Sequence, residues 1–277
     1  MYASSLIPSS SDFYPQINAD FRRLKTKKSA HAICVNPSAS SGQVCEICGF
    51  FPAHSTMPRM LFQKDLAILP TMINERLTEF VKLAHGRRAI RRYLDRPVPP
   101  DLLNQLLEIA TWAPSAHNRQ PWRFAVLEAP ASKEKLARAM GQRLRADRTA
   151  DGDPHEAIEQ DVARSFARIT GAPVLIVVCL SLADMDSYPD ARRSQAERTM
   201  TVQSVAMSAQ TLWLAAHAAG LGTCWLCAPL FVPELVQQTL ALPPDWEPQG
   251  LLTLGWPAEE KEKTRAPWLT RVQFLDR

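Results

Sequence analysis

The run Pro173-Val-Leu-Ile-Val-Val-Cys-Leu180 is a continuous apolar segment with the length of a β-strand. A strand with one face in water would carry a polar residue at every second position, and this run carries none. Both faces of the strand must therefore be covered, as at the centre of a sheet with helices on each side.

Helical and strand patterns alternate on both sides of the run. Helices with one apolar face are predicted from Met72, from Asp101, and over residues 132–147, 155–169 and 230–240. Further strands are predicted at 123–127 and 250–255. No internal repeat is visible. The order of these elements predicts an α+β fold in which a sheet lies between helices.

The longest predicted helix covers residues 197–219 and is apolar on nearly every side. Such a helix is buried, either by its own domain or by a partner subunit. It is expected to end at Gly220, which can adopt the left-handed conformation of a C-cap. A single domain covers only some of its faces, so we expect the surface around Met207, Gln210 and Leu214 to be buried in a two-fold homodimer.

Residues 1–71 differ in character from the rest of the chain. They carry seven Lys or Arg against four Asp or Glu, are rich in Ser and Pro, and show no sustained helical or strand period. We expect a poorly ordered leader here, or a gene-model artefact if translation starts at Met72. Residues 72–277 are then the one folded domain.

The leader contains one cluster of residue types that bind zinc, namely His31, Cys34, Cys45, Cys48 and His54. Its Cys45-x-x-Cys48 pair has the spacing of a zinc knuckle. A structural zinc site usually has two such pairs, and only one is present here. A chance cluster is therefore the favoured interpretation, and no metal is predicted.

The composition of the 277 residues excludes several classes of protein. Apolar residues make up 46% and charged residues 22%, as in globular domains. No stretch of about 18 consecutive apolar residues would span a membrane, and no apolar signal segment opens the chain. Six cysteines are too few for a disulfide scaffold, which favours a reducing cytoplasm. The net charge of +4 is too small to favour nucleic acid as a partner.

Three short segments concentrate the residues that carry chemistry. Gly86-Arg-Arg-Ala-Ile-Arg-Arg-Tyr93 holds four arginines that can bind a phosphate, although composition alone favours a solvated basic loop. Ala113-Pro-Ser-Ala-His-Asn-Arg-Gln-Pro-Trp122 is either a polar ligand site or an ordinary helix–strand connection. Gly220-Leu-Gly-Thr-Cys-Trp-Leu-Cys227 has two glycines, which either admit a planar ligand or end a helix before a strand.

Cys224-x-x-Cys227 also has the spacing of a thioredoxin-type redox pair. Those pairs lie at helix N-termini, where the pKa of one thiol is lowered. Here the pair would follow Gly222 along a strand, where residues three positions apart point to opposite faces. We therefore do not expect the two cysteines to act as a redox pair.

Together, in this order and at these spacings, the three segments resemble the FMN-dependent nitroreductase family. The similarity covers about residues 72–270 and is anchored by Arg87-Arg-Ala-Ile-Arg-Arg-Tyr93, Pro114-Ser-Ala-His-Asn-Arg-Gln-Pro-Trp122 and Gly220-Leu-Gly-Thr-Cys-Trp225. It implies a nitroreductase-like α+β fold with a central, mostly antiparallel sheet flanked by helices and a long buried helix at a dimer interface. Residues 204–255 look most like the nitroreductase-type domain associated with the deazaflavin coenzyme γ-glutamyl ligase, although the ligase half is absent.

The resemblance assigns contacts to the phosphate and ribityl chain of FMN. These would come from Arg87, Arg88, Arg91, Arg265 and the backbone of Ala89 and Ile90. The family usually has Ser where this chain has Ala89, so one hydroxyl contact is missing.

The resemblance also places residues around the flavin ring. Ser115 and Asn118 would lie at the flavin edge with Gln120 in support, and main-chain groups of Leu226 and Cys227 would lie beside the ring. No catalytic residue is expected, because the flavin carries the chemistry. The histidines His85, His117 and His217 are interpreted as structural or pocket-lining.

The implied activity is transfer of hydride from NAD(P)H through FMN to an electron-poor acceptor such as a nitroaromatic or a quinone. One alternative is a reductase of a dehydro-deazaflavin coenzyme precursor. Another is a flavin-binding or flavin-consuming relative without NAD(P)H turnover. The implied partners are a small-molecule acceptor and a second copy of the chain, with no nucleic acid and no membrane. Side chains that would contact the acceptor are expected around residues 147–195.

Overall fold

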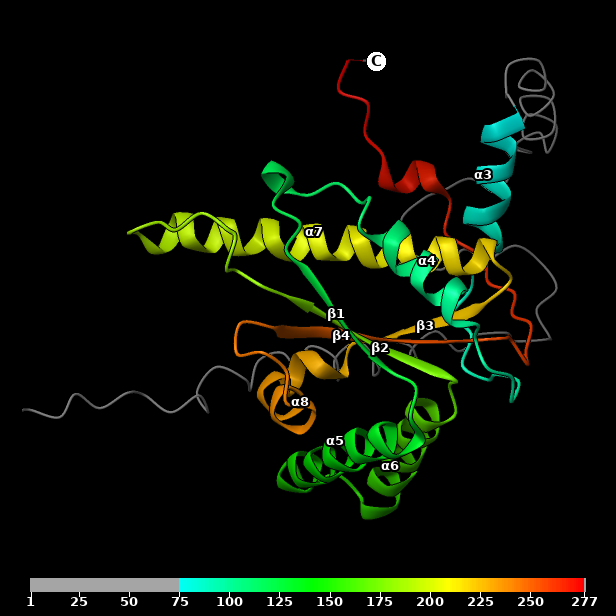
Figure 1. The fold of residues 1–277 in the computed structure, drawn as a ribbon, viewed down its shortest axis with the longest axis vertical. Helices are drawn as coiled ribbons and strands as arrows, with labels where there is room; N and C mark the ends of the chain where they lie inside the picture. Colours follow the sequence, from blue (N-terminus) through cyan, green and yellow to red (C-terminus); the bar gives the residue numbers. More distant parts are fainter. Residues whose placement is uncertain (1–74, 277) are drawn as a thin grey trace, which may run out of the picture. The chain divides into compact units, whose positions relative to one another are not determined.

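The computed structural model of the protein describes residues 75–276. The predicted leader and its cysteine–histidine cluster lie outside the described residues. The helices of the described part are α3 Glu75–Gly86, α4 Pro100–Ala110, α5 Pro130–Ala150, α6 His155–Thr170, α7 Ala191–Ala218 and α8 Pro233–Leu240 (Figure 1). Its strands are β1 Trp122–Leu127, β2 Val174–Leu180, β3 Gly222–Leu226 and β4 Glu247–Gly255, and its short 3₁₀ helices are η3 Ala116–Asn118, η4 Ala228–Phe231 and η5 Trp268–Arg271.

The four strands form one antiparallel sheet in the order β1-β2-β4-β3. The two central strands pair in a register that places Val174 opposite Leu254 and Ile176 opposite Leu252. Every residue of β2 is buried. The prediction of a central strand covered on both faces, drawn from the apolar run, is therefore confirmed.

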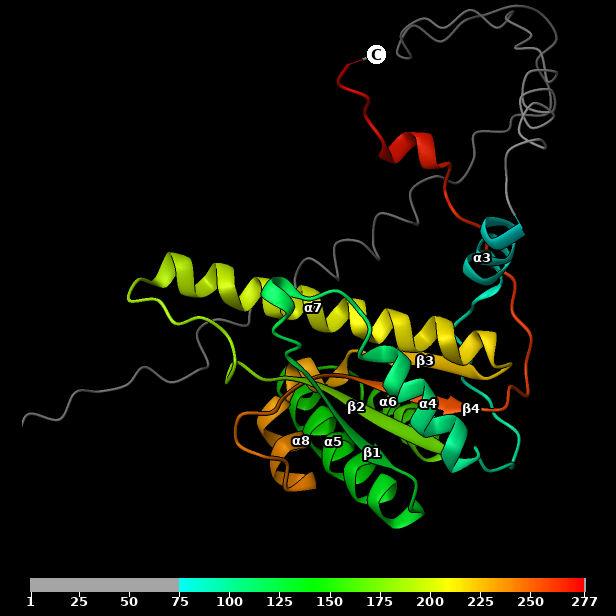
Figure 2. The same cartoon turned by 45° about the horizontal axis from the view of Figure 1, so that its top comes forward.

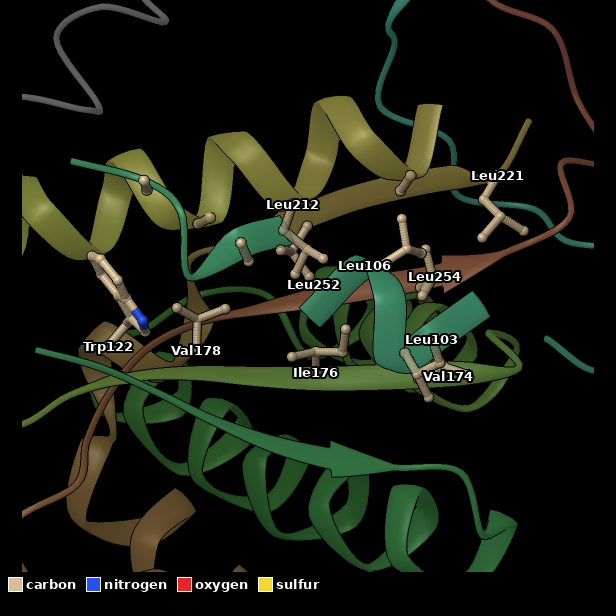
Figure 3. Packing of buried hydrophobic residues seen from close by; sticks show 14 of the residues in the cluster. Leu103, Leu106, Trp122, Val174, Ile176, Val178, Leu212, Leu221, Leu252 and Leu254 are labelled. Carbon is tan, nitrogen blue, oxygen red and sulfur yellow. The ribbon is translucent and has the colours of Figure 1, made fainter. Parts of the chain in front are cut away.

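Helices cover both faces of the sheet (Figures 1 and 2). On one face, Leu106 of α4 and Leu212 of α7 pack with Ile176 and Leu252 of the central strands (Figure 3). On the other face, α5, α6 and α8 contribute Leu136, Ile169 and Val236 to a second apolar cluster. Full burial of one such side chain stabilises the fold by about 2 kcal/mol. The α+β architecture with a sheet between helices is thus confirmed.

Helix α7 begins earlier than the sequence predicted, and one chain covers only part of its surface. It starts at Ala191 rather than at residue 197, because Asp190 accepts a hydrogen bond from the amide of Arg193 at 2.9 Å and so caps the helix. Its fully buried residues include Thr201, Ser204, Val205, Ser208, Ala209, Leu212 and Ala216. This spacing of three or four defines one face, which packs on the sheet and α4. On the outer face Val202 and Met207 are each 39% exposed, as expected for a helix that one domain covers on only some of its faces. Burial of this outer face by a partner subunit stays a prediction.

Helix α3 forms as predicted but does not join the core. Its apolar positions include Phe80, which is 54% exposed, and Val81, which is 39% exposed. No residue of α3 is buried. The periodicity therefore predicted the helix correctly without indicating what covers its apolar face. Among the described residues, no helix has the length and apolar character needed to cross a membrane.

Candidate functional site

The segment between α3 and α4 lies against the outer edge of β3. Ala89 pairs with Thr223 in a parallel bridge, and the amide of Ile90 donates to the carbonyl of Thr223 at 2.9 Å. This approach requires Gly222, because a Cβ there would lie 2.7 Å from Cγ2 of Ile90. Gly222 therefore makes room for a neighbouring side chain rather than for a planar ligand. Gly220 has φ +77° just after α7, as predicted for a C-cap.

Three of the predicted phosphate ligands come together beside α7. Arg87 lies over the ring of Trp213, with its Cζ 4.3 Å from the ring centroid. Arg88 donates from Nη2 to the carbonyl of Lys263 at 3.3 Å, which brings the C-terminal segment alongside. The pKa of Arg87 is lowered, first by burial and then by the charges of Arg265 and Arg88. We call Arg87, Arg88 and Arg265 the arginine cluster.

The arginine cluster has the properties of an anion site. Its three like charges repel one another, and a bound anion would offset that repulsion. The Nε atom of Arg88 is buried and has no hydrogen-bond acceptor among the described residues. Buried donors are nearly always satisfied in proteins, so this unmet donor indicates a ligand oxygen. The residues present therefore fit a phosphate group.

Arg91 lies apart from the arginine cluster, next to α6. Its amide donates to Oε1 of Glu259 at 2.6 Å. The pKa of Arg168 is lowered by burial and then by the charges of Arg91 and Arg164. A pocket of about 550 Å³ is lined by Arg91, Arg92, Tyr93, Arg164, Ala167, Arg168, Gly171, Glu259 and Lys261. Five cations and one carboxylate line this basic pocket, which therefore favours an electron-rich or anionic group.

The sequence motifs did not predict four charged lining residues of the basic pocket, which are Arg164, Arg168, Glu259 and Lys261. The two arginines lie on the predicted 155–169 helix, outside the three segments with chemical motifs. Their spacing of four positions places them on one face of α6. That spacing was readable in the sequence, but it did not indicate that Arg91 faces the same space.

The end of β3 carries the two residues predicted beside the flavin ring. Leu226 is partly buried, and Cys227 is exposed and precedes η4. Cys224 is buried, and burial raises its pKa, whereas the charges of Arg91, Arg168 and Lys261 act in the opposite direction. Both thiols are free and lie in different environments, as their positions along the strand predicted.

The loop at 115–120 is held in an unusual backbone conformation. His117, Asn118 and Gln120 have φ values of 51°, 53° and 51°, which non-glycine residues rarely adopt. Oγ of Ser115 accepts a hydrogen bond from the amide of Gln120 at 3.0 Å. Nε2 of Gln120 lies 3.4 Å from Oδ1 of Asn118, consistent with the predicted supporting role. Such conformations cost about 1–3 kcal/mol each and persist mainly at functional sites.

Within one chain, this loop and the arginine cluster contact α7 at different places. The amide of Ala116 donates to Oγ of Ser204 at 3.2 Å, whereas Arg87 stacks on Trp213. At 1.5 Å per residue these two positions are roughly 14 Å apart along the helix. The structure therefore brings three predicted phosphate ligands together but does not bring Ser115, Asn118 and Gln120 to them.

The sequence profile of the nitroreductase family matches residues 84–256, which include the segment along β3, the 115–120 loop and the whole sheet. The chain belongs to the nitroreductase family. The family and the nitroreductase-like α+β fold predicted from the sequence are thus confirmed. The predicted dimer interface at the long helix stays a prediction. The finer association with the deazaflavin coenzyme ligase stays a prediction.

Individual relatives within this family carry several names. A 5,6-dimethylbenzimidazole synthase of Rhodospirillum rubrum is 30% identical over 199 residues, which cover 68% of this chain and 88% of the relative. An NADH dehydrogenase of Thermus thermophilus is 32% identical over 210 residues, which cover 67% of this chain and 90% of the relative. A crystal structure described as a nitroreductase in complex with FMN, from Desulfovibrio desulfuricans, matches with a TM-score of 0.54 and 25% identity, covering 69% of this chain and 94% of that chain. These similarities support an oxidoreductase of the flavin-dependent type.

Proposed function

We propose that the protein is an FMN-dependent oxidoreductase that transfers electrons from NAD(P)H to a small electron-poor acceptor such as a nitroaromatic or a quinone. The arginine cluster carries this proposal, because its charges converge around the buried, unmet Nε of Arg88. A phosphate monoester would supply both the countercharge and the missing acceptor. Family membership and the FMN complex of the Desulfovibrio relative support flavin mononucleotide as that ligand.

The layout of the basic residues suits a mononucleotide. Two residues separate Arg88 from Arg91, so their Cα atoms are at most about 11 Å apart. The phosphate would bind at the arginine cluster, and the ring would reach the basic pocket and the end of β3 with Leu226 and Cys227. One phosphate is all that the arginine cluster can bind, which favours FMN over FAD.

When bound, the flavin supplies the two-electron chemistry, and the protein holds and polarises it. Arg91 and Arg168 would place positive charge beside the ring, where negative charge develops on reduction. Ile90 would contribute less to FMN binding than the resemblance implies, because its amide already donates to the carbonyl of Thr223. Ala89 offers no hydroxyl, so the phosphate depends on the arginines.

A second copy of the chain would complete the site. The outer face of α7 exposes Val202 and Met207, and α3 exposes Phe80, so an apolar surface is available for two-fold association. The 115–120 loop lies away from the arginine cluster of its own chain. We therefore assign Ser115, Asn118 and Gln120 to the flavin of the partner subunit in a homodimer.

A second candidate function is a flavin-binding or flavin-consuming protein without NAD(P)H turnover. The relative from Rhodospirillum rubrum favours it, because that protein is named a synthase rather than a dehydrogenase. Reduction of a dehydro-deazaflavin precursor is a third candidate, which depends only on the sequence resemblance.

Absorption and turnover together test the proposal. The purified protein should show the two absorption bands of a flavin, and boiling it should release FMN rather than FAD. NADH or NADPH with a quinone or a nitroaromatic should then give steady multiple turnover with the flavin retained. Loss of the flavin after one turnover would favour the second candidate. A protein that neither contains FMN nor takes it up would contradict the assignment altogether.

A further inference from the structure

Buried polar atoms without a partner gather around the arginine cluster. Four such side-chain atoms occur in residues 75–276, and three belong to this region. They are Arg88 Nε, Trp213 Nε1 and Thr223 Oγ1. Thr223 is the residue that pairs with Ala89. An unmet buried donor costs about 1–3 kcal/mol, so a group of them indicates a ligand with several acceptor oxygens.

Trp213 has two distinct relations to this region. Its ring supports the guanidinium of Arg87 at 4.3 Å, an arrangement that is favourable and fixes the plane of the arginine. Its Nε1, which can only donate, has no acceptor in the described part of the chain. If Trp213 only packed against Arg87, its buried Nε1–H would have no acceptor to explain its position.

Another tryptophan of the same chain provides the comparison. Arg96 lies over the ring of Trp256 at 4.0 Å, and Nε1 of Trp256 donates to the carbonyl of Pro97 at 3.1 Å. The two arginine–tryptophan stacks have similar distances between the guanidinium and the ring but differ at the indole N–H. In the Trp256 stack the protein itself satisfies the indole N–H, and in the Trp213 stack it does not.

The surroundings of Trp213 are positively charged. His217 follows one turn later on α7, and its Nε2 lies 2.9 Å from where a Cβ on Gly86 would be. Burial and the charges of Arg87 and Arg88 lower the pKa of His217. The indole N–H therefore lies in a positive field that attracts an anion.

We propose that Trp213 is a ligand of the phosphate monoester: its indole N–H donates to a phosphate oxygen while its ring holds Arg87 in place. This inference rests on the proposed function, because FMN is the phosphate monoester concerned. It adds to the arginine cluster a neutral donor from α7, the helix that also supports the 115–120 loop.

The test compares FMN with riboflavin, which has the same ring and no phosphate. Titration calorimetry on the apoprotein would give both affinities for the wild type and for Trp213→Phe, which retains a ring under Arg87 but has no N–H. We expect the substitution to lower the affinity for FMN about tenfold to a hundredfold and to leave the affinity for riboflavin unchanged. Trp256→Phe is the matched control, and it should leave the ratio of the two affinities unchanged.

Each other outcome has a definite meaning. Equal loss of FMN and riboflavin affinity in Trp213→Phe would show a structural role and overturn the proposal, as would unchanged FMN affinity. Inorganic phosphate could instead stabilise the wild type against heat while the protein binds FMN no more tightly than riboflavin. That result would assign the site to a free anion and would also overturn the proposal. Failure of the wild type to bind either flavin would instead contradict the proposed function.

Discussion

Arg198 of α7 and Glu247 at the start of β4 are joined by two parallel hydrogen bonds, with Nη1 of Arg198 2.8 Å from Oε2 of Glu247. Gln249 donates a further bond to Oε1 of Glu247 at 3.0 Å. The bond from Arg198 is the largest cause of the lowered pKa of Glu247. This pair fixes α7, which carries Ser204 and Trp213, to a central strand of the sheet.

Replacing Glu247 by Gln should lower the free energy of unfolding at pH 7 by about 1 kcal/mol, because the pair is partly exposed to solvent. The folded pKa lies below the ordinary value of 4.5, so the wild type loses this contribution as the pH falls through the folded pKa. Urea unfolding should show that the difference shrinks at low pH. A difference in unfolding free energy that does not change with pH would contradict the assignment of this effect to the Arg198–Glu247 pair. Glu134→Gln, in the exposed pair with Arg138, is the control.

Replacing Gly222 by Ala should displace the segment that carries the arginine cluster, because the new methyl group would meet Ile90 at 2.7 Å. Overpacking of this kind costs about 1–3 kcal/mol. We expect a lower melting temperature and weaker FMN binding. Adding Ile90→Ala should restore part of both, and a double variant no better than Gly222→Ala would show that the two residues do not interact.

Replacing both Arg88 and Arg265 by Ala should remove the flavin. Two charge-assisted hydrogen-bonding groups are lost, so FMN affinity should fall at least about a hundredfold. The flavin content after gel filtration measures this. Arg143→Ala, in an exposed pair with Asp147 on α5, should keep full occupancy. Full occupancy in the Arg88→Ala, Arg265→Ala variant would place the phosphate elsewhere.

His217 should make the stability of the apoprotein depend on pH. Burial, Arg87 and Arg88 hold its folded pKa below the ordinary value of 6.5. The unfolded chain therefore takes up a proton first, and stability falls as the pH decreases from 6.5 through the folded pKa. His217→Gln should flatten this decrease in melting curves, and FMN should reduce it by offsetting the arginine charges. If stability falls with pH equally steeply in His217→Gln and in the wild type, His217 is not the cause of this decrease. The control is His155→Gln, at an exposed histidine, which should leave the decrease unchanged.

Replacing Met207 by Glu should separate the proposed dimer, because a charge would be placed in the apolar outer face of α7. Sedimentation should show a monomer, and the flavin should be lost in the same samples, since the 115–120 loop of the partner is lost with it. Ala146→Glu, on an exposed turn of α5, should leave a flavin-loaded dimer. A flavin-loaded monomer of the wild type would contradict the shared site.

Much of the fold follows from local patterns in the sequence. The 173–180 run predicted a buried central strand because alternation was absent, and Gly220 predicted the end of α7. The apolar pattern of α7 predicted burial of the helix, but such a pattern does not say whether one chain or two cover its outer face. The apolar face of α3 failed to predict burial for the same reason.

The site was predictable where it depends on local motifs. Arg87, Arg88 and Arg265 do converge, although Arg265 is distant in the sequence and was placed only through the family resemblance. Arg91 lines the basic pocket beside α6, and its amide donates to Glu259, a long-range contact that no spacing shows. The left-handed residues His117, Asn118 and Gln120 could not be expected, because no glycine marks them.

The order of strands in the sheet also affects how the chain is made. β4 lies between β2 and β3, yet it is the last strand to leave the ribosome. Until it emerges, the apolar residues of β2 lack their main partner, and β3 has no neighbour in the sheet. Pairing across so long a stretch of chain is slow and leaves apolar strands exposed to aggregation. The nascent protein therefore closes its sheet only after β4 has left the ribosome, and Arg265, a predicted phosphate ligand, emerges later still.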